Sequence, residues 1–194
     1  MFGESGGYRE RVRGSFTSRE LSLMAVVSAL GGAVSIPIGY AGGFLASVPL
    51  LPFGAAQALS GLHVFWIAFA SVMVDKRGVG TLTGVLKGLV ESALISFHGV
   101  LAIPISTAEG AVLDICLLIF KGDRTVSKCV AGGFSSASNV LVLQILALPE
   151  LPIVILAFMY SASFISGFVF AGLFLEQIVD YLRKHALKGL VRNR

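Results

Sequence analysis

Apolar residues in this sequence gather in long runs instead of alternating with polar ones. The hydrocarbon core of a bilayer is about 30 Å thick, so a helix needs roughly 20 apolar residues to cross it. Full spans are predicted at Leu21–Ile38, 56–74, 79–97, 100–120, 127–148 and 152–175. Pro49 and Pro52 interrupt the stretch 43–55, which is predicted to be a short broken or re-entrant piece. The expected fold class is an all-α integral membrane protein with six transmembrane helices.

The composition supports a lipid environment. Of 194 residues, 55% are hydrophobic and only 13% are charged, and the mean hydropathy is +0.85. A soluble domain usually has about a quarter of its residues charged. This composition therefore excludes an ordinary soluble globular domain. Cys116 and Cys129 fall in or beside apolar runs, where packing residues are expected rather than a disulfide or metal ligands.

Basic residues lie in every second connection between the predicted spans, and therefore on one side of the membrane. They occupy the N-terminal segment, the loops around Lys76 and Arg124, and the C-terminal tail. The opposite connections, at 40–52, 97–104 and 148–152, contain no Lys or Arg. The positive-inside rule then predicts a multi-pass protein of the cell membrane with both termini in the cytoplasm. The predicted parts are an N-terminal cytoplasmic segment at 1–19, a transmembrane domain at 20–176 and a basic cytoplasmic tail at 177–194.

Four ionisable residues fall inside predicted spans, namely Lys87, Glu91, Glu109 and Asp114. Each costs at least a few kcal/mol in hydrocarbon unless it faces a partner or a wet cavity. Lys87 and Glu91 are four residues apart and share a helix face. Counting depth at 1.5 Å per residue places Lys87 level with Asp114, and Glu91 level with Glu109 near the midplane. A Lys87–Asp114 ion pair is therefore predicted to close the floor of a cavity, below a layer formed by the two glutamates.

Two readings of these charges stay open. All four residues can be structural contacts between helices, or the two glutamates can bind a ligand. Carboxylates without a basic partner suit a ligand with cationic or amidine-like donors, so Glu91 and Glu109 are the preferred ligand contacts. Trp66 is a candidate to stack on a ligand ring, and Asn139 is a candidate hydrogen-bonding group because a mid-span amide needs partners. Gln57, His63 and His98 are weaker candidates, for which packing is the default interpretation.

The first span carries alanines four residues apart, at Ala25, Ala29 and Ala33. Small residues at this spacing form a flat ridge that another helix can approach closely. The ridge indicates either a contact within the chain or docking of a partner membrane subunit.

Motifs for catalysis are missing from the sequence. It contains no G-x-x-x-x-G-K-[ST] loop, no H-E-x-x-H and no G-x-S-x-G. The chain is therefore not expected to be an enzyme, to bind ATP itself, or to need a cofactor or metal. Nucleic acid is not an expected partner.

The chain resembles a substrate-binding S component of an energy-coupling factor (ECF) vitamin transporter, with its length, six spans and alanine ridge. Within that family it looks most like the YkoE-like subgroup, associated with thiamin or its hydroxymethylpyrimidine precursor. The resembling stretches are Asp75-Lys-Arg-Gly, Gly88-Leu-Val-Glu91 and Glu109-Gly-Ala-Val-Leu-Asp114. Lys87 departs from the apolar residue expected there, and Asp114 stands where a Glu is usual. The resemblance implies that the alanine ridge docks on a transmembrane coupling subunit, which sits on a pair of cytoplasmic ATPases.

The preferred function is substrate capture for an ATP-driven importer. A small vitamin-like solute is expected to enter from outside, into a cavity capped by the segment 43–55. One alternative is a stand-alone proton-coupled carrier of small solutes, whose buried carboxylates titrate during transport. Another is a membrane assembly subunit that binds no solute.

Overall fold

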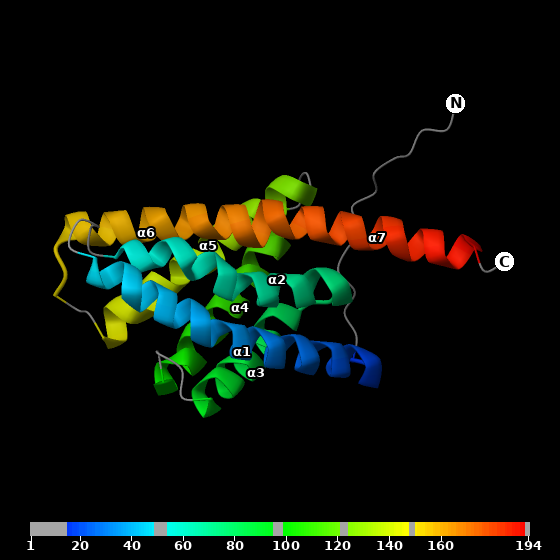
Figure 1. The fold of residues 1–194 in the computed structure, drawn as a ribbon, viewed down its shortest axis with the longest axis horizontal. Coiled ribbons are helices and arrows are strands. Elements are labelled where there is room, and N and C mark those ends of the chain that lie inside the picture. The colour runs from blue at the N-terminus through cyan, green and yellow to red at the C-terminus, as the bar shows by residue number, and fades with distance from the viewer. Residues whose placement is uncertain (1–14, 49–53, 95–98, 121–123, 148–149, 193–194) are drawn as a thin grey trace.

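The computed structural model describes residues 15–48, 54–94, 99–120, 124–147 and 150–192, and all regular elements in these ranges are helices. The elements are α1 (Ser18–Ser47), η1 (Ala55–Leu59), α2 (Ser60–Val74), α3 (Val79–Ala93), η2 (Gly99–Leu101), α4 (Ala102–Ile119), α5 (Arg124–Leu146), α6 (Ile153–Gly167), η3 (Phe168–Phe174) and α7 (Leu175–Arg192). They pack side by side as an elongated bundle (Figure 1). The predicted all-α fold with six membrane helices is confirmed.

Within the described ranges, five stretches are long and apolar enough to cross a membrane, at Ser18–Ser47, Ala55–Val74, Gly99–Ile119, Thr125–Leu146 and Ile153–Leu182. The sixth helix, α3, has 15 residues and carries Lys87 and Glu91. At 1.5 Å per residue it is only about 22 Å long. It packs against α1, α2 and α4, which cover its polar face.

The first helix is longer than the sequence pattern predicts. α1 begins at a capping box, in which Thr17 and Glu20 each accept a hydrogen bond from the other's backbone N–H. It continues through Pro37, an exposed position, to Ser47, and proline is more frequent in membrane helices than in soluble ones. The prediction that a broken segment starts at residue 43 is therefore wrong. Pro49 and Pro52, on which that prediction rested, lie outside the described residues.

A tight turn joins α2 to α3. Asp75 ends α2 with φ 51°, and Gly78 precedes α3 with φ 82°. Glycine adopts a positive φ without steric cost, so Gly78 allows the chain to reverse within four residues. The turn places α2 and α3 antiparallel and brings Lys76 to the start of α1, where its Nζ atom lies 2.7 Å from Oε2 of Glu20.

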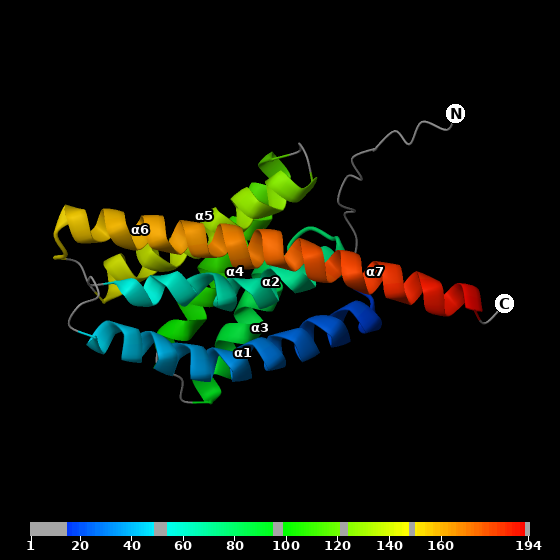
Figure 2. The ribbon, with the colours of Figure 1, turned by 45° about the horizontal axis from the view of Figure 1, so that its top comes forward.

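The last span is one continuous rod built from α6, η3 and α7 (Figure 1). Its middle part, Phe168–Phe174, is π-helical. The rod extends beyond the other helices at the end of the bundle where α1 begins (Figure 2). The helix therefore includes most of the basic segment 177–194.

Helices α3 and α4 approach each other backbone to backbone. A Cβ atom added to Gly110 would lie 2.1 Å from the carbonyl oxygen of Gly80, and one added to Gly84 would lie 2.1 Å from that of Ser106. Only glycine permits such contact, which resembles the small-residue packing of other membrane helices. Glu109 on α4 is thereby held beside the cavity that Lys87 and Glu91 of α3 also border, and Asp114 is held beside the first turn of α3.

A cluster of serine hydroxyls joins α2, α5 and α6. The Ser60 hydroxyl lies 2.7 Å from that of Ser136 and 2.8 Å from that of Ser163.

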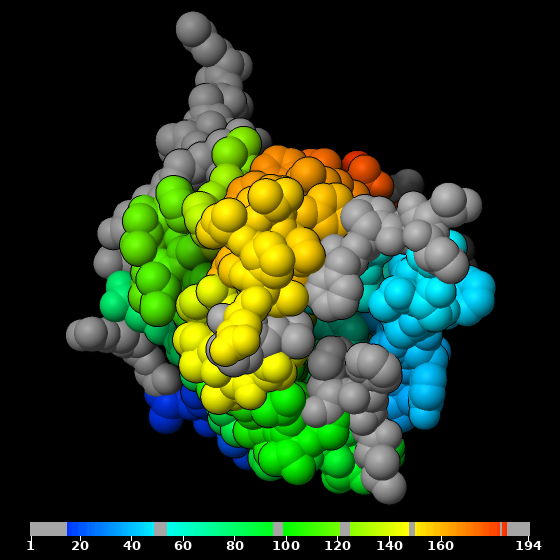
Figure 3. Space-filling view, turned by 90° about the vertical axis from the view of Figure 1, so that its left-hand side faces the viewer, coloured from blue at the N-terminus to red at the C-terminus, as the bar shows by residue number. Residues whose placement is uncertain are grey.

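Seen from the end of the bundle opposite the C-terminus, α5 and α6 lie together, and the cyan residues of α1 and η1 lie to their right (Figure 3).

Candidate functional site

An ion pair inside α3 is the first component of the site. Nζ of Lys87 lies 2.7 Å from Oε2 of Glu91 and 3.3 Å from the Ser106 hydroxyl on α4. Lys87 is 0% exposed and Glu91 is 2% exposed. The predicted Lys87–Asp114 pair is wrong. The register of the two helices explains the difference: Gly80 of α3 lies against Gly110 and Gly88 lies against Ile103, so Lys87 is level with the part of α4 around Ser106 and not with Asp114.

Asp114 caps the beginning of α3 instead. Its Oδ1 accepts a hydrogen bond from the backbone N–H of Gly80 at 3.1 Å. Its Oδ2 accepts from the backbone N–H and the hydroxyl of Thr81, both at 2.8 Å. α3 has no side-chain cap of its own at this end. The Asp114 carboxylate of α4 therefore accepts hydrogen bonds from amide groups that the first turn of α3 leaves unpaired. Its negative charge also interacts favourably with the positive, N-terminal end of the α3 helix dipole.

Glu109 is the most unusual residue of the site. It is 0% exposed, and neither carboxylate oxygen has a hydrogen-bond partner in the described part of the chain. Asn139 of α5 lies beside it, 5% exposed, and its Oδ1 is also without a donor. Buried polar atoms are normally hydrogen-bonded, so three unpaired oxygens at one place indicate a site for an additional group.

Two small cavities meet at this place. The inner cavity, of about 10 Å³, is bordered by Lys87, Glu91, Glu109 and Asn139, with His63 and Ser106. The outer cavity, of about 90 Å³, lies between the second half of α1 and η1–α2. Its lining is Ile38, Gly39, Gly42, Gly43, Ala46, Ala56, Gln57, Leu59, Ser60, His63 and Asn139. His63 and Asn139 border both cavities, so the two form one candidate binding region with a deep polar part and a shallow, mostly apolar part.

His63 is the residue that sequence reasoning undervalued. Its Nδ1 atom lies 2.9 Å from the Ser35 hydroxyl of α1 and 4.0 Å from Oε1 of Glu91. A lone histidine in an apolar span is usually a packing residue. The available signal was a serine of the first span, Ser35, on the face opposite the alanine ridge.

Trp66 does not border either cavity. It packs against Gly31 of α1, where an added Cβ would lie 2.8 Å from the Trp66 Cβ, and its ring meets Phe65 edge-on. The structure therefore gives no support to stacking of Trp66 on a ligand in this region. His98 lies outside the described residues.

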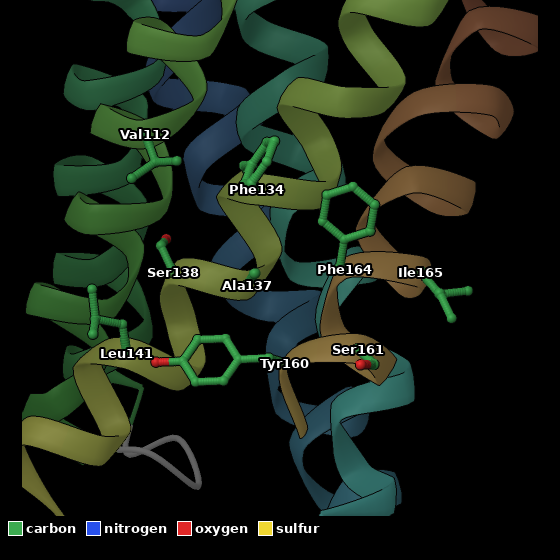
Figure 4. A pocket seen from close by; sticks show the side chains of 9 residues that line it. All are labelled: Val112, Phe134, Ala137, Ser138, Leu141, Tyr160, Ser161, Phe164 and Ile165. Carbon is green, nitrogen blue, oxygen red and sulfur yellow. The ribbon is translucent and has the colours of Figure 1, made fainter. Parts of the chain in front are cut away.

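A larger groove of about 680 Å³ lies elsewhere, on the outer face of α5 and α6 (Figure 4). Phe134 and Phe164 border one end of it, and Tyr160, whose hydroxyl donates to Oε1 of Gln144 at 3.0 Å, borders the other. None of its nine lining residues carries a charge. Its lining is mostly apolar and lies on helices that are long and apolar enough to cross a membrane, away from the buried charges of the two smaller cavities.

Comparison with known proteins places the chain in a transporter family. The family model of the permease component of ABC-type cobalt transport systems matches residues 19–142, which include every residue of the candidate region. The chain belongs to this family. A crystal structure of an S-component of an ECF transporter has the same fold, with a TM-score of 0.79 over 89% of this chain and 88% of that one, at 22% sequence identity. No curated protein matches.

As a permease component, the chain is a multi-pass membrane subunit of a transport system and not an enzyme. Its alanine ridge is open to the surroundings, since Ala25, Ala29 and Ala33 are all exposed. The opposite face of α1 is buried, and small residues such as Ser28 and Ser35 face the bundle there. No described part of the chain therefore covers the ridge.

Proposed function

We propose that this chain is the substrate-capture subunit of an ECF-type importer and that its ligand is thiamin or its hydroxymethylpyrimidine precursor. The observation that carries the proposal is the buried Glu109 carboxylate, whose two oxygens have no donor in the described structure. Burying such a group costs free energy unless a partner pairs with it. A ligand that carries N–H donors and positive charge supplies that partner.

The charges around the inner cavity support a cationic ligand. Lys87 and Glu91 neutralise each other in their ion pair. Glu109 then remains as a carboxylate without a basic partner within ion-pairing distance among the residues that the structure describes. An organic cation balances it, whereas a phosphorylated or carboxylate ligand adds a second negative group.

The size of the region implies that binding widens it. Pockets for drug-sized ligands usually measure roughly 300–1,000 Å³, whereas the two cavities measure about 10 and 90 Å³. The helices around the two cavities must therefore separate for a ligand of this size to bind. The outer cavity borders α1 along glycine and alanine, whose small side chains leave room for a ring when the helices separate.

The arrangement of charge supports capture from outside. Lys76 pairs with Glu20, and Lys128 pairs with Glu176, at the end of the bundle where α1 begins. We assign this end, the N-terminal segment 1–19 and the tail 177–194 to the cytoplasm. The outer cavity lies toward the other end, near the end of α1 and the start of α2. The exposed ridge of Ala25, Ala29 and Ala33 is then the surface for the coupling subunit, which joins the chain to a pair of ATPases.

Calorimetric titration of the purified chain with thiamin and with hydroxymethylpyrimidine tests the proposal. Glu109→Gln is expected to weaken binding about 10–100-fold, since a hydrogen bond to a charged group contributes about 1.5–3 kcal/mol. Glu150→Gln, at an exposed position, is the matched control and is expected to leave binding unchanged.

Cobalt, which the family's description names, is the comparison ligand in the same titration. Among the described residues, no group of three or more His, Cys, Asp or Glu side chains is arranged to hold a metal ion. Binding of Co²⁺ without binding of thiamin or the pyrimidine would overturn the proposal. Uptake by the chain alone, abolished by a protonophore and unaffected by ATP depletion, would favour a proton-coupled carrier instead.

A further inference from the structure

The last membrane span ends where a run of basic residues begins. The stretch Ile153–Leu182 is long and apolar enough to cross a membrane, and Arg183 and Lys184 follow it directly. From residue 181 to residue 194 the sequence contains five Lys or Arg and no Asp or Glu. The helix continues through most of this run, since α7 ends at Arg192. A helical segment with a high positive charge therefore starts at the end of the span.

Tyr181 places the membrane boundary at the same level by a second observation. Its side chain is 61% exposed, and the centroid of its ring lies 3.9 Å from that of His185, one turn further along α7. His185 is also exposed. Tyrosine is enriched at membrane–water interfaces, because its ring is apolar and its hydroxyl is polar. An exposed tyrosine directly before the basic run is therefore expected at the headgroup level.

The basic face of α7 is turned away from the bundle. Leu175 and Val179 are fully buried and belong to the core cluster that includes residues of α2. Lys184 is exposed. Helix positions 184, 188 and 192 follow one another at intervals of four, so they lie along one face, opposite to positions 175 and 179. The positive charge thus lies on the side of α7 that faces the surroundings of the bundle.

The straight course of the helix determines which basic residues reach the lipid headgroups. α6, η3 and α7 form one rod that extends beyond the start of α1 (Figure 2). At 1.5 Å per residue, Lys188 lies about 9 Å beyond Leu182, and Arg192 about 15 Å beyond it. The headgroup layer on each side of the hydrocarbon core is roughly 5–8 Å thick. Arg183 and Lys184 therefore lie at the level of this layer, Lys188 at its edge and Arg192 outside it.

We propose that the basic face of α7 binds the anionic headgroups of phospholipids in the cytoplasmic leaflet, mainly through Arg183 and Lys184. The proposal goes beyond the proposed function and uses the orientation assigned there. Basic clusters directly after a membrane span attract anionic lipids, because the cytoplasmic surface of the bilayer is negatively charged. The bound headgroups hold the rod of α6, η3 and α7 at one depth in the membrane. An acidic surface on another protein fits less well, since the charge begins at the headgroup level and not further into the cytoplasm.

Native mass spectrometry of the full chain in detergent tests the proposal. The protein is titrated with phosphatidylglycerol, which is anionic, and with phosphatidylcholine that carries the same acyl chains and has no net charge. We expect phosphatidylglycerol to bind more tightly. The double variant Arg183→Gln with Lys184→Gln is expected to bind it about 10–30-fold more weakly, because each basic residue near the headgroups contributes about a factor of five. Its affinity for phosphatidylcholine should stay unchanged, which also shows that the variant is folded.

The double variant Arg9→Gln with Arg11→Gln is the matched control. It removes the same charge from the N-terminal segment, on the same side of the membrane, and is expected to keep the affinity for phosphatidylglycerol. An equal loss in this control would overturn the proposal, because overall charge and not the face of α7 would then explain the binding. Equal affinity of the unchanged protein for the two lipids would overturn it as well.

Thermal unfolding of the same proteins gives a second measurement. A ligand that binds only the folded state raises the unfolding midpoint, so phosphatidylglycerol should stabilise the unchanged chain more than the α7 variant. A variant that keeps its affinity for phosphatidylglycerol but no longer co-purifies with the ATPases would overturn the proposal in favour of a protein contact. No thiamin is present in these experiments, so their result is independent of the test of the proposed function.

Discussion

The ammonium of Lys87 and the carboxylate of Glu91 form an ion pair at 2.7 Å across one turn of α3, where both side chains are almost completely buried. Removing one partner of a buried pair leaves an uncompensated charge, whereas replacing both by apolar or neutral residues is often tolerated. The pair is therefore a structural element of the fold as well as a neighbour of the candidate ligand region.

Lys87→Met is expected to destabilise the protein by about 3–5 kcal/mol, because Glu91 loses its counter-charge. The double variant Lys87→Met with Glu91→Gln should recover most of this loss. Thermal unfolding in detergent, followed by circular dichroism, measures both effects. A double variant no more stable than Lys87→Met alone would contradict the explanation.

Lys76→Met is the matched control for the same measurement. Lys76 also forms an ion pair, with Glu20, but its side chain is 17% exposed and that of Glu20 is 23% exposed. A partly exposed pair of this kind contributes at most about 1 kcal/mol. The unfolding midpoint should accordingly move much less than in Lys87→Met.

Asp114→Ala is expected to lower stability by about 1–3 kcal/mol, because the amides of Gly80 and Thr81 lose their acceptor. Asp114→Asn keeps one carbonyl oxygen and should lose less. Thr81→Val removes only the hydroxyl contact and should cost about 1 kcal/mol. Urea or thermal unfolding of the three variants checks this order, and equal losses for Asp114→Ala and Thr81→Val would contradict the capping role.

The helices were largely predictable from sequence because the bilayer sets their length. The predicted spans at 56–74 and 100–120 differ by at most two residues from the observed Ala55–Val74 and Gly99–Ile119. The end of α1 was not predictable in the same way. Glycine and proline, which usually end helices in water, are tolerated in a membrane helix, so the pattern after Ile38 did not show that α1 continues to Ser47.

The ionisable residues of the candidate site were predictable from the sequence, but the register and rotation of their helices were not. Glu91 and Glu109 both border the inner cavity, yet Gly80 lies against Gly110 and Gly88 against Ile103, which differs from the levels obtained by counting residues. Counting also could not show which way each side chain turns about its helix axis. Lys87 therefore pairs within α3 rather than with Asp114, and Trp66 faces Gly31 rather than the cavities.

Gly110→Ala is expected to be strongly destabilising, because its Cβ would lie 2.1 Å from the carbonyl oxygen of Gly80. The backbones of α3 and α4 must separate to admit it, and such overpacking typically costs 1–3 kcal/mol or more. Gly42→Ala is the control, since its Cβ would meet only the Ala56 Cβ, at 3.4 Å. Thermal unfolding and size-exclusion profiles compare the two, and similar behaviour would contradict the close approach of α3 and α4.

Ala29→Leu, alone or with Ala25→Leu, is expected to abolish co-purification with the coupling subunit and the ATPases while leaving the isolated chain folded. A leucine side chain projects from the flat ridge and prevents the partner helix from approaching closely. Ala157→Leu, an exposed alanine of α6, is the matched control and should leave the complex intact. An intact complex in the ridge variants would contradict docking at this face.

The glycine contacts between α3 and α4 have a mechanical consequence. Relative motion of these helices would disrupt contacts between backbone atoms at Gly80, Gly84 and Gly110, so the two behave as one rigid block that carries the buried charges. α1 packs on this block through a hydrogen bond from Ser28 to the Thr83 carbonyl and through Gly32, where an added Cβ would lie 2.7 Å from Cγ1 of Val90. The buried charges are thus carried by a helix pair joined at its backbones, against which the inner face of the alanine-bearing helix is seated.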